Sequence, residues 1–230
     1  MTGLSTIRPR GLAIALCALG ATLLALPGAA AAKATQYVIG LDLSKSNPLV
    51  TDSDYARKVA TRIEPLIQHL EFMDIVTLRT FGSYNTGENA LRIDKTISKL
   101  DPAEKVSIIV REVVAGVPRL IESGRLKAQP STNMLAFMEN MAEVVDCKKV
   151  NTTFILITDG IEDSAYARLI AKGATLPEPR ADLFKGCQEL QILGLGQGQS
   201  SPEITVRLRE QWTAWAEKAG FKSFLGLNDW

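Results

Sequence analysis

A short hydrophobic run ends in three oxygen-bearing side chains, within the segment YVIGLDLSKSNP at residues 37–48. These side chains are Asp42, Ser44 and Ser46. A carboxylate and two hydroxyls at this spacing can build an Asx or Ser turn, cap a helix, act as a nucleophile or bind a hard cation. The other residues of the 230-residue chain must decide between these chemistries.

Two further side chains with oxygen atoms lie in predicted loops next to a strand or a helix. Asp159 directly follows TTFILIT at residues 152–158, the most strand-like segment, and Thr132 lies in a loop before a helix. Asp42 stands at the end of the strand predicted over residues 37–43. Because ligands of α/β folds collect at the carboxyl ends of strands, we expect these residues to share one rim. Their oxygens suit Mg²⁺ or Mn²⁺, and two carboxylates would leave a divalent ion able to accept an anionic ligand.

Each of these residues also has a structural interpretation that needs no metal. Asp42 and the two serines that follow it can form a turn and cap a helix. Asp159 can belong to an ordinary Asp-Gly turn, and Thr132 can be the N-cap of the following helix. The convergence of all five residues on one rim favours the metal site.

Hydrophobic periodicity predicts the elements that position these residues. The expected strands are residues 37–43, 74–81, 90–97, 152–158, 190–195 and 221–225. The expected helices are residues 53–72, 102–123, a segment that includes 135–145, and 201–218. Strands that alternate with helices indicate an α/β fold with a doubly wound, mostly parallel central sheet of about six strands and helices on both faces.

Three motifs together resemble those of the von Willebrand factor type A (VWA) domain. DLSKS at residues 42–46 fits the D-x-S-x-S signature after the first strand, Thr132 fits the second-loop threonine, and FILITDG at residues 154–160 fits the fourth-strand motif. The resemblance covers residues 36–225, which we take as one VWA-like domain. One departure is Pro130-Ser131, where the family usually carries glycine before the threonine.

The resemblance implies a metal-ion-dependent adhesion site (MIDAS) and a role for each residue. Ser44, Ser46 and Thr132 would ligate Mg²⁺ directly, and Asp42 and Asp159 would act mainly through bound water. The open coordination position would take a carboxylate from a partner protein. The function expected on this basis is a metal-dependent protein-binding module for adhesion or assembly, and not an enzyme.

Residues 1–32 have the pattern of a secretory signal peptide. Arg8 and Arg10 form a basic start, residues 11–26 are uncharged and rich in Ala and Leu, and Pro27-Gly28 precedes small residues suitable for cleavage. We therefore expect an exported bacterial protein, periplasmic or secreted, with no membrane span after cleavage. The alternative is an uncleaved membrane anchor.

Cys147 and Cys187 remain after removal of residues 1–32. In an oxidising compartment, two remaining cysteines favour a disulfide. Each lies a few residues before a predicted buried strand, at residues 152–158 and 190–195. If these strands are parallel neighbours, both cysteines lie at the amino-terminal edge of the sheet, close enough to bond.

Composition narrows the function further. The net charge of +1 argues against a nucleic-acid partner, because phosphate binding needs a concentrated basic surface. The single histidine, His69, lies in a predicted surface helix without a partnered acid nearby, which disfavours a serine hydrolase. A Mg²⁺-dependent hydrolase that uses the same rim stays as the alternative function, and it would differ from a binding module by turning over a substrate.

Overall fold

The computed structural model of the protein describes residues 1–3, 32–83, 91–171, 173–199 and 201–230. Most of the expected signal peptide lies outside the described residues. Residues Lys33–Trp230 form one compact unit. Within the described part of the chain, no helix is long and apolar enough to cross a lipid bilayer.

A single six-stranded sheet forms the centre of this unit, with the order β3-β2-β1-β4-β5-β6. The strands are β1 (Thr35–Asp42), β2 (Ile75–Phe81), β3 (Arg92–Thr96), β4 (Asn151–Ile157), β5 (Glu189–Leu193) and β6 (Ser223–Leu227). All neighbouring pairs are parallel except β2 and β3, which are antiparallel. The strand order reverses between β1 and β4, so the switch point of the fold lies between these two strands.

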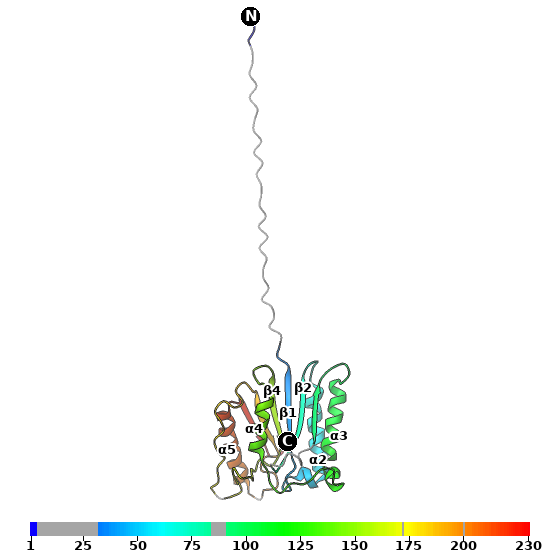
Figure 1. Ribbon diagram of the computed structural model, residues 1–230, viewed down its shortest axis with the longest axis vertical. Helices are drawn as coiled ribbons and strands as arrows, with labels where there is room; N and C mark the ends of the chain where they lie inside the picture. The colour runs from blue at the N-terminus through cyan, green and yellow to red at the C-terminus, as the bar shows by residue number, and fades with distance from the viewer. Residues whose placement is uncertain (4–31, 84–90, 172, 200) are drawn as a thin grey trace. The chain divides into compact units, whose positions relative to one another are not determined.

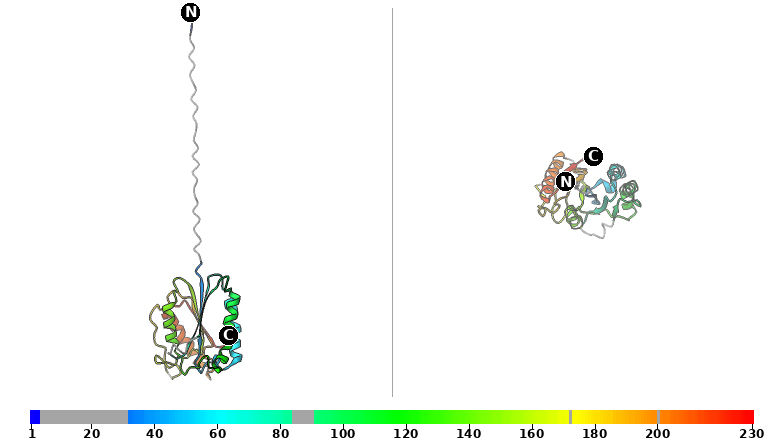
Figure 2. Two further views of the ribbon diagram at one scale, coloured as in Figure 1. Left: turned by 45° about the vertical axis from the view of Figure 1, so that its right-hand side comes forward. Right: turned by 90° about the horizontal axis from the view of Figure 1, so that it is seen from above.

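Helices cover both faces of the sheet, with α2 and α3 on one side and α4 and α5 on the other (Figures 1 and 2). The helices are α1 (Pro48–Thr51), α2 (Ser53–Gln68), α3 (Ala103–Glu122), α4 (Met134–Val144) and α5 (Pro202–Ala219). The doubly wound α/β fold predicted from the sequence is confirmed. The short helix α1 was not predicted, because its four residues are too few to show a period.

The central strands are buried on both faces, which explains their nearly continuous hydrophobic sequences. Val38 of β1 packs in the core beneath α4 and α5, and its neighbour Ile39 packs in the core beneath α2 and α3. Trp212 and Trp215 of α5 are buried in the first of these cores. This packing fixes β1 and β4 rigidly beneath the loops that follow them.

The amino-terminal end of the sheet carries the disulfide. Cys147 and Cys187 are bonded, with their Cα atoms 4.8 Å apart. They precede β4 and β5, which are parallel neighbours in the sheet. The pairing expected from the sequence is therefore present, and it lies at the opposite end of the strands from Asp42.

Candidate functional site

The two candidate carboxylates stand side by side at the switch point of the sheet. Asp42 is the last residue of β1, and Asp159 follows β4, which ends at Ile157. β1 and β4 are hydrogen-bonded neighbours, with Leu41 opposite Ile157. Both carboxylates are buried, at 0% and 1% exposure. The structure thus places at one sheet edge the two acids that the sequence placed at strand ends.

The carboxylate of Asp42 is held at both oxygens. Its Oδ1 accepts a hydrogen bond from the backbone N–H of Ser44 at 2.8 Å, and its Oδ2 accepts one from the Thr158 hydroxyl at 2.7 Å. The first bond is an Asx turn, so the structural interpretation of this segment is partly correct. The second bond comes from the residue that follows β4 and fixes the carboxylate orientation.

Ser44 and Ser46 present their hydroxyls to each other, with the two Oγ atoms 3.2 Å apart. Ser44 is buried and Ser46 is exposed, so the pair leads from the interior to the surface. Neither serine caps a helix, because Asn47 caps α1 and Asp52 caps α2. Their hydroxyl oxygens therefore stay available to a ligand.

Backbone hydrogen bonds join the loop after β1 to the loop before α4. The N–H of Gln129 donates to the carbonyl of Leu43 at 2.8 Å, and the carbonyl of Gln129 accepts from the N–H of Lys45 at 2.9 Å. The loop before α4 is joined in turn to the loop after β4, because Thr132 and Asp163 exchange N–H···O bonds of 3.1 and 2.9 Å. With the bond between Thr158 and Asp42, all three loops are tied together.

Thr132 is buried at 2% exposure, but it is not the N-cap of α4. That position belongs to Asn133, whose side chain makes no capping bond. Glu162 supplies the acceptor for the start of α4 instead, because its Oε2 accepts from the backbone N–H groups of Met134 and Leu135 at 2.8 and 3.1 Å. The N-cap interpretation of Thr132 is therefore wrong, and its hydroxyl has no hydrogen bond within the described part of the chain.

Asp159 has one satisfied oxygen and one unsatisfied oxygen. Its Oδ1 accepts from the N–H of Ile161 at 2.9 Å, whereas Oδ2 is buried without a hydrogen-bond partner among the described residues. Gly160 follows with a φ of 75°, and a Cβ there would lie 2.4 Å from a Leu195 methyl group. Trp212 donates to the Gly160 carbonyl at 2.8 Å. These contacts fix the turn. Oδ2 of Asp159 is therefore an exception among buried polar atoms, most of which are hydrogen-bonded.

The electrostatics of the pair are unfavourable without a cation. Burial raises the pKa of Asp42 to about 6. Burial and the negative charge of Asp42 raise the pKa of Asp159 to about 7, although the neighbouring Ser46 hydroxyl opposes the shift. A bound divalent cation would reverse both effects, because it favours the ionised form of each acid.

The donor set fits Mg²⁺ or Mn²⁺. It consists of carboxylate and hydroxyl oxygens, which hard cations prefer. Such an ion would complete the Asp159 carboxylate oxygen that has no hydrogen-bond partner within the described residues. Nowhere in the described residues do three or more His, Cys, Asp and Glu side chains gather, so a softer, histidine- or cysteine-based site has no support there.

Sequence reasoning missed three residues that hold the site. Thr158 precedes Asp159 in the fourth-strand motif, and its hydroxyl could have been noted as a third polar group there. Glu162 supports α4, and burial raises its pKa to about 7 although it accepts two backbone hydrogen bonds. Trp212 donates to the loop that carries Asp159, and no local signal in the sequence indicated this bond.

Comparison with known proteins gives structural likenesses only. No family model matches this sequence, and no curated protein matches it. The conserved hypothetical protein BatB from Bacteroides thetaiotaomicron is 15% identical, with a TM-score of 0.47, over 85% of this chain and 91% of BatB. The PilB minor pilin from Streptococcus sanguinis is 12% identical, with a TM-score of 0.49, over 87% of this chain and 59% of the pilin.

The manganese-loaded TRAP protein from Plasmodium vivax is a third such structure. It is 19% identical, with a TM-score of 0.45, over 77% of this chain and 63% of TRAP. This chain therefore spans less than two thirds of both the pilin and TRAP. At these identities and scores the likeness concerns the fold, so the interpretation of the site rests on its own residues.

Proposed function

We propose that this protein is an exported, metal-dependent protein-binding module of the VWA type, which acts in adhesion or assembly at the bacterial cell envelope. Residues 1–32 would be its signal peptide, and residues 36–225 its VWA-like domain. The mature protein would be periplasmic or secreted. Its partner would be a protein that offers a carboxylate.

The observation that carries this proposal is the buried Oδ2 of Asp159, which has no hydrogen-bond partner within the described residues. It lies at a rim where a second buried carboxylate, Asp42, is also found. Leaving such an oxygen unsatisfied costs about 1–3 kcal/mol, and more when it is charged. A cation held at this rim would remove the cost, so the arrangement is better explained as a binding site than as packing.

Each residue of the rim has a role in this proposal. Ser44, Ser46 and Thr132 would hold Mg²⁺ or Mn²⁺ directly, and Asp42 and Asp159 would hold it mainly through water. The ion would supply a positively charged, open coordination position for an acidic side chain of the partner. The exposed Ser46 marks the side from which that residue would approach.

The location of His69 favours binding over hydrolysis. His69 caps the carboxyl end of α2, which leads into the amino-terminal end of β2. It is therefore at the opposite end of the sheet from Asp42 and cannot serve as a base for Ser44. The hydrolase alternative would need the metal alone to activate water, and it predicts turnover of an ester or phosphoester substrate.

Calorimetry with Mg²⁺ and Mn²⁺ on the natively exported protein tests the metal site. We expect saturable binding that disappears in the Asp42→Ala variant. The matched control is Asp54→Ala, which removes an exposed aspartate from α2 and should leave metal binding unchanged. An absence of binding heat, or equal heat in the Asp42→Ala variant, would contradict the proposal.

Capture of partners from envelope extract, with and without EDTA, tests the use of the metal. A partner that binds through a carboxylate should be released by EDTA. If it keeps full affinity, the metal is not the contact. Hydrolysis of p-nitrophenyl esters or phosphates by the metal-loaded protein, lost on Asp42→Ala, would favour the hydrolase instead.

A further inference from the structure

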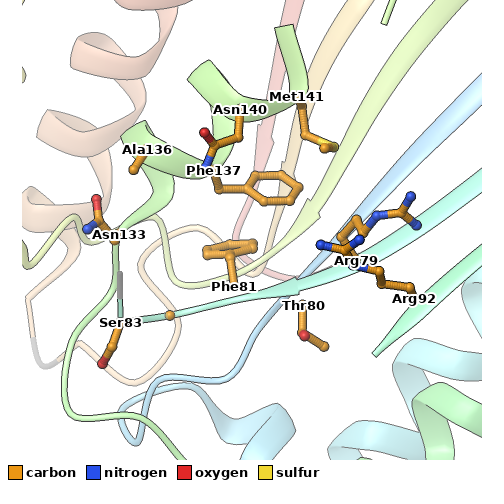
Figure 3. A pocket seen from close by; sticks show the side chains of 11 residues that line it. Arg79, Thr80, Phe81, Ser83, Arg92, Asn133, Ala136, Phe137, Asn140 and Met141 are labelled. Atoms are coloured by element: carbon orange, nitrogen blue, oxygen red, sulfur yellow. The ribbon is translucent and has the colours of Figure 1, made fainter. Parts of the chain in front are cut away.

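A groove lies beside the rim, where the sheet extends beyond α4 (Figure 3). Phe137 of α4 packs over Gly40 of β1, so α4 covers the centre of the sheet. Among the described residues no helix covers the outer strand β3 on this side, and its residues Arg92, Asp94 and Thr96 are exposed. The resulting cavity of about 110 Å³ lies between β2, β3 and α4.

The base of the groove is apolar. Phe81 at the end of β2 stacks on Phe137 of α4, with ring centroids 4.8 Å apart and an interplanar angle of 27°. Met141, one turn further along α4, also lines the groove. Figure 3 shows the two rings facing each other at its centre. A cavity of about 150 Å³ accommodates benzene, so this smaller one suits a single aliphatic side chain.

Two arginines stand together at one end of the groove. Arg79 of β2 and Arg92 of β3 are directly opposite in the antiparallel register, and Figure 3 labels both at the same end of the groove. Like charges at such a position destabilise a sheet. Arg79 is compensated, because its Nη2 donates to both carboxylate oxygens of Asp94 at 2.8 Å. Arg92 has no ion-pair partner among the residues that the structure describes.

The groove also borders the loop that carries Thr132. Ser131 and Ser83 have their Oγ atoms 2.9 Å apart, and Ser83 lines the groove. Asn133, on the other side of Thr132, lines it as well. The Asn133 side chain is buried and its Oδ1 has no hydrogen-bond partner within the described residues. An acceptor is therefore held ready next to the apolar base.

We propose that this groove is a second contact site for the protein partner, which binds an aliphatic side chain of leucine size followed directly by an acidic residue. The aliphatic group would occupy the space beside Phe81 and Phe137, and the carboxylate would pair with Arg92. Because Arg92 stands opposite Arg79 and has no ion-pair partner among the described residues, its charge identifies the acidic neighbour. That the same partner also binds the metal at the rim rests on the proposed function. The proposal that the groove binds such a peptide does not depend on it.

Peptide titrations observed by NMR test the groove directly. The protein is kept in EDTA, so that the result does not depend on the metal site. The probe is acetyl-Gly-Leu-Asp-Gly-amide, compared with peptides in which Asn replaces Asp or Ala replaces Leu. We expect saturable shifts of the amide signals of Arg92, Asn133 and Asn140 with the first peptide, and binding about tenfold weaker with either of the others.

The variant Arg92→Ala should bind the first peptide about tenfold more weakly and no longer distinguish Asp from Asn. Its melting temperature should stay equal or rise, because one of two opposed cations is removed. The matched control is Arg57→Ala on α2, a helix that covers the other face of the sheet. This variant should keep full peptide affinity.

Failure of the groove and failure of the metal site give different results. Absence of peptide shifts in the groove, or equal binding by the Arg92→Ala variant, would overturn the proposal whatever calorimetry shows for Mg²⁺. Equal affinity for all three peptides would overturn it too, because the groove would then select neither group. Peptide binding in EDTA with the expected selectivity would support the groove even if no metal binds at the rim.

Discussion

Two buried aspartates at opposite ends of the central sheet, Asp74 and Asp159, differ in how completely they are hydrogen-bonded. At the amino-terminal end, Asp74 is 8% exposed, and its two oxygens accept from the N–H groups of Thr35 and Glu71 at 2.7 and 2.8 Å. At the carboxyl-terminal end, Asp159 is 1% exposed and its Oδ2 has no partner among the described residues. Asp74, like Asp42 at the rim, is thus bonded at both oxygens, whereas Asp159 is bonded at only one within the described residues.

This difference distinguishes a carboxylate with a structural role from a carboxylate of the proposed metal site. Asp74 ties the starts of β1 and β2 together, next to the end that the disulfide closes. The rim at the other end keeps two carboxylates whose raised pKa values show that the fold alone does not favour their ionised forms. Residues that lower stability where they stand are expected at functional sites, because activity and stability are selected separately.

The largest expected effect concerns the amino-terminal end. Replacing both Cys147 and Cys187 by alanine should lower the free energy of unfolding by about 4 kcal/mol, from the loop-closure entropy of a 40-residue separation. Denaturant unfolding measures it, and the wild-type protein in reductant serves as a parallel sample. Metal affinity at the rim should be unchanged in protein that stays folded. A loss of metal affinity in the folded double variant would show that the two ends of the sheet are not independent.

The second effect is the pH dependence of the free energy of unfolding, which the two carboxylates of the rim produce in the metal-free protein. Because the folded-state pKa values of Asp42 and Asp159 are raised to about 6 and 7, the metal-free protein is stabilised by their protonated forms. This stability is lost as pH rises through those values, and between pH 5 and 8 we expect a decrease of about 4 kcal/mol. Denaturant unfolding in EDTA measures the decrease.

Saturating Mg²⁺ should restore the lost stability at pH 8, because it binds the ionised carboxylates. The Asp42→Asn variant in EDTA is the control, and its stability should depend less on pH. A metal-free protein that becomes more stable from pH 5 to 8 would contradict the assigned pKa values.

The smallest effect is a matched pair of substitutions with opposite signs. Asp74→Asn should destabilise the metal-free protein by about 2 kcal/mol, because an amide leaves one backbone N–H without its acceptor. Asp159→Asn should stabilise it by about 1 kcal/mol at pH 8, because an unsatisfied buried charge is removed. Both are measured by denaturant unfolding in EDTA. Destabilisation of similar size at both positions would mean that Asp159 is as structural as Asp74.

Much of the fold could be predicted because hydrophobic periodicity is local. The alternation of residues 90–97 predicted a half-exposed strand, and β3 occupies Arg92–Thr96 with alternating exposure. Boundaries were less accurate. The last strand was expected at residues 221–225 and lies at Ser223–Leu227, since Gly220 adopts a φ of 93° at the end of α5 and Phe221 is buried before the strand begins.

The candidate site was predictable in its residues and not in its bonding. Asp42 and Asp159 follow hydrophobic strands, so their place at one sheet edge followed from the sequence. Thr132 could equally have been a helix cap, because serine, threonine, aspartate and asparagine favour that position whatever else they do. Only the structure shows that Glu162, about one turn of chain beyond Asp159, accepts the N–H groups of α4 instead.

The sequence by itself determined which residues are buried in β1 and β4, which acids follow those strands and which cysteines precede β4 and β5. These properties depend on neighbours a few positions apart, and the chain carries them wherever it folds. The tertiary structure alone decided that Asp159 Oδ2 lacks a partner and that Arg79 lies opposite Arg92. Both depend on strand register and on contacts between segments distant in the sequence. A hydrogen bond is made or lost over about an ångström, and the spacing of residues in a sequence does not fix positions to that precision.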